Sequence, residues 1–404
     1  MPDLAILGAG AAGLLAAARA AGRGRRTVLL EKNTRPGLKI LISGGTRCNL
    51  THDCGAAGIV EAFGANGKFL RPALAALPPA ALRKLFVDEG VPLTVETETG
   101  KVFPASQRAQ DVLAALLRMV EKSGARLVTG EPVVRLSAGF RIETPRQVVD
   151  VPKLILATGG LSYPSTGTTG DGFRFAAALG HTIVPPRAAL TPLASGEAWV
   201  RALAGIAIQD AEVRVVERGN PKALDRRRAA VLFTHFGISG PAAMDVSRTV
   251  SGHALPAALA LEIDLLPATP APALDAWLRA EAAAGGKRQV VTVLAERVPR
   301  RLADAVVAGL PPERKLSELS KAERAAVVTA LKGLRVPLTG TLGFAKAEVT
   351  AGGVALDEVN PKTMESRIVP GLFFAGEVLD LDGWIGGYNF QSAFSTGWLA
   401  GSSV

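Results

Sequence analysis

Two glycine-rich segments lie near opposite ends of this 404-residue chain, and together they restrict how it can fold. The first, Gly-Ala-Gly-Ala-Ala-Gly at 8–13, follows an apolar run at 4–7. The second combines Gly-Glu at 376–377 with Gly-Tyr-Asn at 387–389. Both read as a strand that ends in a glycine turn before a helix, the pattern that holds nucleotides. If both segments serve one ligand, the chain ends meet in one domain, and the residues between them include inserted domains.

The amino-terminal segment has the context of a dinucleotide-binding fingerprint. A strand at 4–7, a helix near 11–21 and a strand at 27–31 form a βαβ unit, and Glu31 follows Gly13 by 18 residues. The alternative, a glycine-rich turn with a surface glutamate, leaves this spacing unexplained. An acid at 31 accepts from ribose hydroxyls and repels a 2′-phosphate, which favours FAD or NAD over NADP. The expected contacts are Gly8, Gly10, Ala11, Ala12, Gly13, Glu31 and Lys32.

A second group of candidate contacts lies in a loop between 37 and 51. Glycines, hydroxyls and cations are dense here, and backbone N–H groups at 43–46 are suited to surround a phosphate or the edge of a flavin. A glycine-rich connection with surface cations is the alternative. The expected contacts are Lys39, Ser43, Gly44, Gly45 and Asn49, with Arg47 adding charge.

A third group follows two buried strands. The apolar run at 154–157 ends in Ala157, Thr158 and Gly159, and a helix with Asp171 as its N-cap is expected soon afterwards. A tight strand-to-helix turn without a ligand is the alternative for this segment. Near the carboxyl end, a strand at 372–375 precedes Gly376 and Glu377, and Gly387, Tyr388 and Asn389 lead into a helix near 390–400. The amino terminus of that helix directs positive partial charge at a ligand. Asp380 and Asp382 are either ribityl ligands or solvated carboxylates.

Changes in the sequence pattern along the chain predict several domains. Residues 1–186 and 346–404 have an α/β pattern, whereas 187–264 and 336–345 show the turns and alternation of an antiparallel sheet or barrel. Residues 265–335 have helical spacing, with a capping box at Ser320-Lys-Ala-Glu323. The expected fold is therefore a split Rossmann-like nucleotide-binding domain with an inserted β-domain, which itself carries a helical subdomain.

Composition limits the partners. The net charge is +10, and residues 265–335 hold 12 Lys plus Arg against 7 Asp plus Glu, a surplus of five, so this segment is the expected contact for a polyanion such as RNA. Two cysteines are too few for a disulfide framework or a cysteine-based metal cluster, so no metal is expected. The apolar run at 4–21 contains three glycines and an arginine, which argues against a membrane span or leader. A cytoplasmic protein is expected, and no oligomeric state is predicted.

With these segments identified, the chain resembles the bacterial BaiN/RdsA-type NAD(P)/FAD-dependent oxidoreductases, within the glutathione reductase-like flavoprotein group. The resemblance covers nearly the whole length. Further motifs that carry it are Lys39 to Asn49, Thr234-His235 to Pro241, Thr350 to Val354 and Thr363 to Ser366. It implies noncovalent FAD in a split domain, an inserted β-barrel and a helical subdomain within the barrel. The family commonly has Gly-Gly-Gly-Arg-Cys-Asn where this chain has Thr46 as the third residue.

The resemblance also implies a reaction. Family members reduce carbon–carbon double bonds conjugated to a carbonyl, and uridine in ribosomal RNA is one substrate class. Hydride from reduced flavin adds to one carbon and an acid protonates the other. Cys48 is the candidate acid, although buried cysteines are more often inert, and His235 either contacts substrate or is structural.

Three functions remain open from the sequence. The preferred one is an FAD-dependent reductase of a conjugated enone in RNA or in a small molecule, with NAD(P)H bound transiently as donor. The second is an oxidase of an amine or similar metabolite. The third is a flavin-containing RNA-binding factor without turnover.

Overall fold

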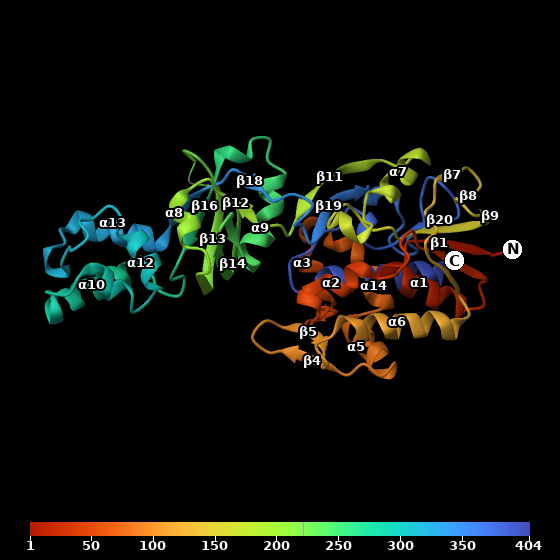
Figure 1. Ribbon diagram of the computed structural model, residues 1–404, viewed down its shortest axis with the longest axis horizontal. Helices are drawn as coiled ribbons and strands as arrows, with labels where there is room; N and C mark the ends of the chain where they lie inside the picture. Colours follow the sequence, from red (N-terminus) through yellow and green to blue (C-terminus); the bar gives the residue numbers. More distant parts are fainter. Residues whose placement is uncertain (221) are drawn as a thin grey trace. The chain divides into compact units, whose positions relative to one another are not determined.

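The computed structural model describes residues 1–220 and 222–404, which divide into two compact units. The first unit joins Met1–Ala188 to Phe344–Val404, and the second is Ala189–Gly343. Figure 1 shows both units, coloured along the chain. Among the described residues, no helix is long and apolar enough to cross a membrane.

A five-stranded parallel sheet forms the centre of the first unit, in the order β20-β10-β1-β2-β6. Its strands are β1 (Leu4–Leu7), β2 (Thr27–Leu30), β6 (Arg126–Val128), β10 (Lys153–Leu156) and β20 (Leu372–Phe374). The three central strands are short apolar runs buried on both faces, as parallel strands between helical layers are. Because β20 pairs with β10 in parallel register, the carboxyl-terminal segment completes a sheet begun at the amino terminus. The predicted α/β, Rossmann-like class is confirmed.

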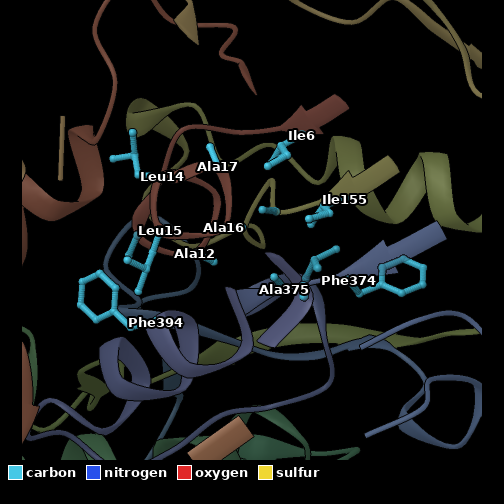
Figure 2. Packing of buried hydrophobic residues seen from close by; sticks show 14 of the residues in the cluster. Ile6, Ala12, Leu14, Leu15, Ala16, Ala17, Ile155, Phe374, Ala375 and Phe394 are labelled. Carbon is cyan, nitrogen blue, oxygen red and sulfur yellow. The ribbon is translucent and has the colours of Figure 1, made fainter. Parts of the chain in front are cut away.

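Helices α1 (Ala11–Ala21) and α14 (Tyr388–Ser403) pack against each other on this sheet. A Cβ on Gly397 would overlap the carbonyl oxygen of Ala12, and one on Gly401 would lie 2.5 Å from that of Ala16. The two backbones therefore approach more closely than side chains allow. Figure 2 shows Leu15 of α1 beside Phe394 of α14, with Ile6, Ile155 and Phe374 of the sheet in the same core.

The other elements of the first unit surround this centre. They are α2 (Leu38–Thr46), β3 (Thr51–His52), α3 (Ala56–Ala62), α4 (Arg71–Ala76), α5 (Pro79–Asp88), β4 (Leu93–Glu96), β5 (Lys101–Pro104), α6 (Ala109–Ser123), β7 (Arg135–Ser137), β8 (Arg141–Glu143), β9 (Val148–Asp150), α7 (Asp171–Ala178), β11 (Ile183–Ala189) and β19 (Val349–Val354). Asp171 is the first residue of α7 and Gly170 is its N-cap, so the cap prediction was wrong by one position. The left-handed backbone of Gly170, at φ +78°, explains the preference for glycine there.

The second unit contains a seven-stranded antiparallel sheet in the order β17-β16-β13-β14-β15-β12-β18. Its strands are β12 (Leu193–Ala194), β13 (Ala207–Glu217), β14 (Ala223–Thr234), β15 (Gly237–Ser239), β16 (Leu259–Asp264), β17 (Leu334–Pro337) and β18 (Gly340–Thr341), with α8 (Ala198–Ala202) and α9 (Pro241–Ser251) beside them. The order runs from β17 to β18 at its two edges, and closure into a barrel stays a prediction.

Four helices connect two neighbouring strands of that sheet, β16 and β17. They are α10 (Ala271–Gly285), α11 (Val290–Leu294), α12 (Arg300–Val306) and α13 (Lys321–Lys332). The capping box of α13 is confirmed, since the Glu323 N–H donates to Ser320 Oγ over 3.1 Å and the Ser320 N–H donates to Glu323 Oε2 over 2.8 Å. Helices and sheet share one apolar core.

The close approach of α1 and α14 yields a stability prediction. We expect Gly401→Ala to lower the free energy of unfolding by about 1–3 kcal/mol, because its Cβ must displace backbone rather than a side-chain tip. Chemical denaturation followed by circular dichroism measures this. Ser403→Ala is the control, because among the described residues the Ser403 hydroxyl bonds only to Leu399 O of its own helix. Equal stability of Gly401→Ala and Ser403→Ala would contradict the packing described.

Candidate functional site

The candidate residues lie where four parallel strands end. Because parallel strands place their carboxyl ends at one edge of the sheet, segments far apart in sequence meet there. Gly8 follows β1, Glu31 and Lys32 follow β2, Ala157, Thr158 and Gly159 follow β10, and Gly376 and Glu377 follow β20. Gly10 caps α1, whose first turn holds Ala11, Ala12 and Gly13, and Gly387 caps α14, which begins with Tyr388 and Asn389. Lys39, Ser43, Gly44 and Gly45 lie in α2, and Cys48 and Asn49 follow it.

The turn between β1 and α1 leaves room for a ligand at one glycine only. Gly8 has φ +97°, and a Cβ there would lie 2.6 Å from Ala157 O. A Cβ on Gly13 would overlap Gly8 O, so both glycines are required by packing. A Cβ on Gly10, in contrast, would meet nothing within 4 Å. Open space directly at the N-cap of an 11-residue helix fits a pyrophosphate, whose negative charge the helix terminus stabilises.

Glu31 is held at the end of β2 by two backbone donors. Its Oε2 accepts from Ala9 N–H over 2.8 Å and its Oε1 from Asn33 N–H over 2.9 Å, and the residue is 7% exposed. Each carboxylate oxygen has two acceptor positions, so the group keeps capacity for ribose hydroxyls. Lys32 instead forms an ion pair with Asp171 at 2.7 Å, and its predicted contact with the cofactor stays a prediction.

One buried hydroxyl at the site has no protein partner. Thr158 Oγ1 is buried and makes no hydrogen bond among the described residues. It lies beside the amino terminus of α7, where a Cβ on Gly172 would overlap it. An unsatisfied buried hydroxyl costs about 1–3 kcal/mol, which a polar ligand atom recovers. Together with the space at Gly10, this orphaned hydroxyl shows that the residues fit an extended nucleotide cofactor such as FAD.

A polar network joins the middle of the site. Lys39 Nζ donates to Glu377 Oε2 at 2.5 Å and to Ser162 Oγ at 2.6 Å. Glu377 Oε1 accepts from Ser162 Oγ at 2.6 Å and from the Thr350 N–H at 3.0 Å. Ser162 and Thr350 are fully buried, and the Lys39 and Glu377 side chains are mostly buried. Lys39 and Glu377 therefore form an ion pair with each other. Their expected contacts with a cofactor stay predictions.

The end of α2 and the residues just after it have a non-helical backbone. Gly44, Gly45, Thr46 and Cys48 all have positive φ, between 55° and 68°. Thr46 thus keeps the left-handed conformation that suits the glycine common in the family, at the strain expected for a β-branched residue. Arg47 pairs with Glu96 at 2.8 Å and lies over the Phe103 ring, and its contribution of charge to a ligand stays a prediction.

Cys48 faces protein rather than an open site. The residue is 0% exposed, and burial raises the pKa of its thiol to about 12 despite a hydrogen bond with Ser43. At neutral pH the group is a neutral thiol enclosed by protein. Its role as proton donor stays a prediction that the geometry does not favour.

The amino terminus of α14 is braced by its neighbours. Asn389 accepts from Gly383 N–H over 2.8 Å and donates to Gly383 O over 3.0 Å, fixing the loop before the helix. The Tyr388 ring stacks on His52, with ring centroids 4.7 Å apart. Asn49 Oδ1 accepts from Val102 N–H, and Asp380 Oδ1 accepts from Gly352 N–H. Asn49, Asn389 and Asp380 therefore hold neighbouring backbone in place through these hydrogen bonds, and contact of Asn49 and Asn389 with a ligand stays a prediction.

Three site residues were missed from the sequence. Ser162 and Thr350 complete the network around Glu377, and His52 supports Tyr388. Thr350 begins the Thr350 to Val354 motif, to which the sequence assigns no function. Ser162 lies two residues after the Gly-Gly pair that follows β10. His52 gave no signal, because it contacts residues more than 300 positions away.

Two further motifs are described within their own units. In the first unit, Ser366 Oγ accepts from Ile368 and Val369 N–H and contacts His181 Nε2 at 2.8 Å, which makes the Thr363 to Ser366 motif structural. In the second unit, His235 is exposed in the turn between β14 and β15, with its ring edge against Phe236.

Comparison with known proteins finds a matching family and similar relatives. The family described as HI0933-like protein Rossmann domain matches residues 2–403. The ribosomal RNA dihydrouridine synthase of Escherichia coli is 34% identical over 409 residues, which cover 100% of this chain and 98% of that protein. The protein of the same name from Haemophilus influenzae is 32% identical, with 99% and 97% covered. The 3-dehydro-bile acid delta(4,6)-reductase of Clostridium scindens is 30% identical, with 100% and 99% covered.

Solved structures show the same fold at low sequence identity. The 3-ketosteroid-delta4-(5alpha)-dehydrogenase from Rhodococcus jostii RHA1 has a TM-score of 0.50 and 16% identity, with 100% of this chain and 96% of that chain covered. A flavocytochrome c3 fumarate reductase in its open conformation also has a TM-score of 0.50 and 16% identity, with 100% and 78% covered.

The open space at Gly10 gives a first test of the site. We expect Gly10→Ala to weaken FAD binding at least tenfold, about 1.4 kcal/mol, while unfolding of the apoprotein is unchanged, because φ is −86° and the Cβ meets no protein atom. Titration with FAD and denaturation of the apoprotein measure the two effects. Gly55→Ala is the matched control, since Gly55 is also an N-cap with negative φ and open space. FAD affinity of Gly10→Ala equal to that control would exclude this turn as the pyrophosphate site.

Burial of Cys48 gives a second test. In native protein at pH 8, iodoacetamide should label Cys54 before Cys48, because a thiol of pKa about 12 is ionised in about one molecule in ten thousand. Peptide mass spectrometry of timed samples measures both rates, with urea-unfolded protein as the control. Labelling of Cys48 at the rate of Cys54 would restore it as an accessible acid.

Proposed function

The chain belongs to the HI0933-like protein family, and from that premise we propose that it is an FAD-dependent oxidoreductase that reduces a carbon–carbon double bond conjugated to a carbonyl. The observation that carries this proposal is similarity over whole chains to relatives named for two such reductions. Dihydrouridine is uracil reduced at C5=C6, a bond conjugated to the C4 carbonyl. The other name describes reduction of double bonds conjugated to a 3-keto group. The shared chemistry, rather than either substrate, is what the family relation supports most directly.

For the substrate we propose uridine in ribosomal RNA. The two relatives with that substrate in their names are 34% and 32% identical to this chain, and the surplus of five positive charges at 265–335 suits a polyanion. A small enone is the second candidate, supported by the bile acid reductase at 30% identity. Relatives named as a synthase and a reductase give no support to an amine oxidase or to a flavin protein without turnover.

In this proposal, different residues at the edge of the sheet bind different parts of the cofactor. The Gly10 turn and the start of α1 bind the pyrophosphate, Glu31 accepts from the adenosine ribose, and Thr158 gains the partner it lacks. The amino terminus of α14 directs positive partial charge to the ring end. When bound, FAD supplies hydride to the electron-poor carbon of the substrate.

Lys39 contributes a further donor near the centre. Glu377 and Ser162 take two of the three N–H donors of its ammonium, and among the described residues the third has no protein acceptor. A ligand or water can accept from it. The ion pair with Glu377 keeps the Lys39 ammonium in place. In this proposal Lys39 positions the ligand atom that accepts from it, and Glu377 orients Lys39.

NAD(P)H as transient electron donor, and a cytoplasmic location, are parts of the same proposal. The sequence contains one dinucleotide fingerprint, which the proposal gives to FAD, so the donor binds elsewhere and leaves after reducing the flavin. A cytoplasmic site of action agrees with the two unpaired cysteines.

The test is an anaerobic assay of FAD-loaded protein with NADPH or NADH and transcribed, unmodified ribosomal RNA. We expect loss of flavin absorbance on adding the donor, recovery on adding RNA, and dihydrouridine in the digested RNA by nucleoside mass spectrometry. Protein carrying Gly10→Ala serves as the cofactor-deficient control. If recovery requires a small conjugated enone and RNA has no effect, the substrate proposal fails while the reaction stands. If neither acceptor reoxidises the flavin, the reductase proposal fails.

A further inference from the structure

Ion pairs occupy many of the cations in the helical segment 265–335. Besides Arg300, which pairs with Asp304, six of the twelve cations between 265 and 335 are paired with carboxylates. These pairs are Arg279 and Arg324 with Asp275, Arg288 with Glu281 and Glu296, Arg314 with Glu323, Lys315 with Glu318, and Lys332 with Asp264. Among the described residues, Arg297 and Arg301 have no carboxylate within ion-pair distance. Fewer cations of this segment are therefore available to a polyanion than its composition suggests. Arg297 and Arg301 are two of the available cations, and they are close together in sequence.

The region around these two arginines is formed by three segments of the second unit. Arg301 at the start of α12 donates to the carbonyl oxygens of Ala202 and Ala204, which brings α12 to the end of α8. Figure 1 shows α8 and α12 between the sheet and the outer helices of this unit. Arg201 lies in the last turn of α8, and its guanidinium donates to Gly196 O. Arg201, Arg297, Arg300 and Arg301 are all exposed, and we call them the α8–α12 arginine cluster.

Little negative charge offsets this cluster. Arg300 has one carboxylate partner, Asp304, at 3.4 Å, and both side chains are 55% exposed, so that pair is weak. Arg201 has no ion-pair partner among the residues that the structure describes. The other cations of the described segment without an ion pair lie apart from one another in the chain: Lys287 between α10 and α11, Lys321 at the start of α13 and Arg335 in β17.

Two arginines of the cluster are held in place before any ligand binds. The guanidinium of Arg297 lies 4.1 Å from the centroid of the Trp277 ring, and Trp277 packs on the apolar core of the unit. Arg301 is fixed by the two carbonyl oxygens at the end of α8. An arginine already ordered loses less side-chain entropy when it forms the paired hydrogen bonds that a phosphate accepts. A stacked guanidinium also presents a flat face to an unpaired base.

We propose that the α8–α12 arginine cluster is the surface that binds the sugar–phosphate backbone of the RNA substrate. The inference rests on the proposed function, because it assigns the RNA contact of the same reaction. Each phosphate neutralised by an arginine releases condensed cations, so the affinity should fall steeply with salt. Backbone contacts of this kind position RNA without reading its sequence.

The test is equilibrium binding of full-length protein to transcribed ribosomal RNA between 50 and 300 mM KCl, a range that spans physiological ionic strength. For R201Q/R297Q we expect a Kd raised at least about tenfold near 150 mM and a salt slope smaller by about 2 than that of the wild type. R201Q/R297Q leaves the Arg301 contacts to α8 intact, so we expect the variant to fold. R201Q/R297Q/R301Q should weaken binding further.

The matched control is R218Q/K222Q, which removes two exposed charges from the hairpin between β13 and β14. That hairpin lies about 33 Å along β13 from the strand end next to α8, at 3.3 Å per residue. We expect a Kd within twofold of the wild type. Equal affinities of R201Q/R297Q and R218Q/K222Q would overturn the inference, as would loss of binding to phosphatidylglycerol vesicles by R201Q/R297Q with RNA binding unchanged.

Dihydrouridine formation separates this inference from the proposed function. If wild-type protein modifies the transcript and R201Q/R297Q modifies it at the same rate and affinity, the cluster is not the RNA surface and the function stands. If the wild type leaves the transcript unmodified while R201Q/R297Q loses RNA affinity, the function fails and the binding surface stands.

Discussion

The contact between α1 and α14 is the constraint on which the first unit depends. Gly397 lies against Ala12 and Gly401 against Ala16, so the two helices run in the same direction from the same edge of the sheet. Tyr388 precedes Gly397 by nine residues and Ala11 precedes Ala12 by one, which staggers the two amino termini by about 12 Å. A pyrophosphate at one terminus and a flavin ring at the other, joined by a ribityl chain, require a separation of this kind. The contact between α1 and α14 therefore holds the two ends of the chain in one unit. It also fixes the distance between the two helix amino termini, and so the length of ligand that can reach both.

Side-chain chemistry then ties the segments together across that edge. The Lys39–Glu377 pair, Ser162 and Thr350 connect α2, the residues after β10, β19 and the residues after β20. Removing one partner of such a mostly buried pair leaves a charge without compensation, so these residues depend on one another. The arrangement holds candidate residues from both ends of the chain at one edge of the sheet.

Local patterns predicted the framework well, because it depends on near neighbours. The bounds of β1 and α1 agree with the sequence expectation, as does the capping box of α13. Contacts across the chain were not readable in the same way. Lys39 and Glu377 are 338 residues apart, so nothing local showed that they would pair with each other. Burial of Cys48 and the pairing of Arg47 with Glu96 likewise depend on tertiary packing. Net charge identified the basic segment, but only the ion pairs show which arginines carry it.

The central claim is that both ends of the chain hold one cofactor, and a crystal structure of the FAD-loaded protein tests it most directly. The account predicts the pyrophosphate over Gly10, the adenosine ribose at Glu31, a polar atom of the ligand at Thr158 Oγ1, and the ring beside the amino terminus of α14. Electron density for FAD that contacts only one of the two glycine-rich segments would contradict it.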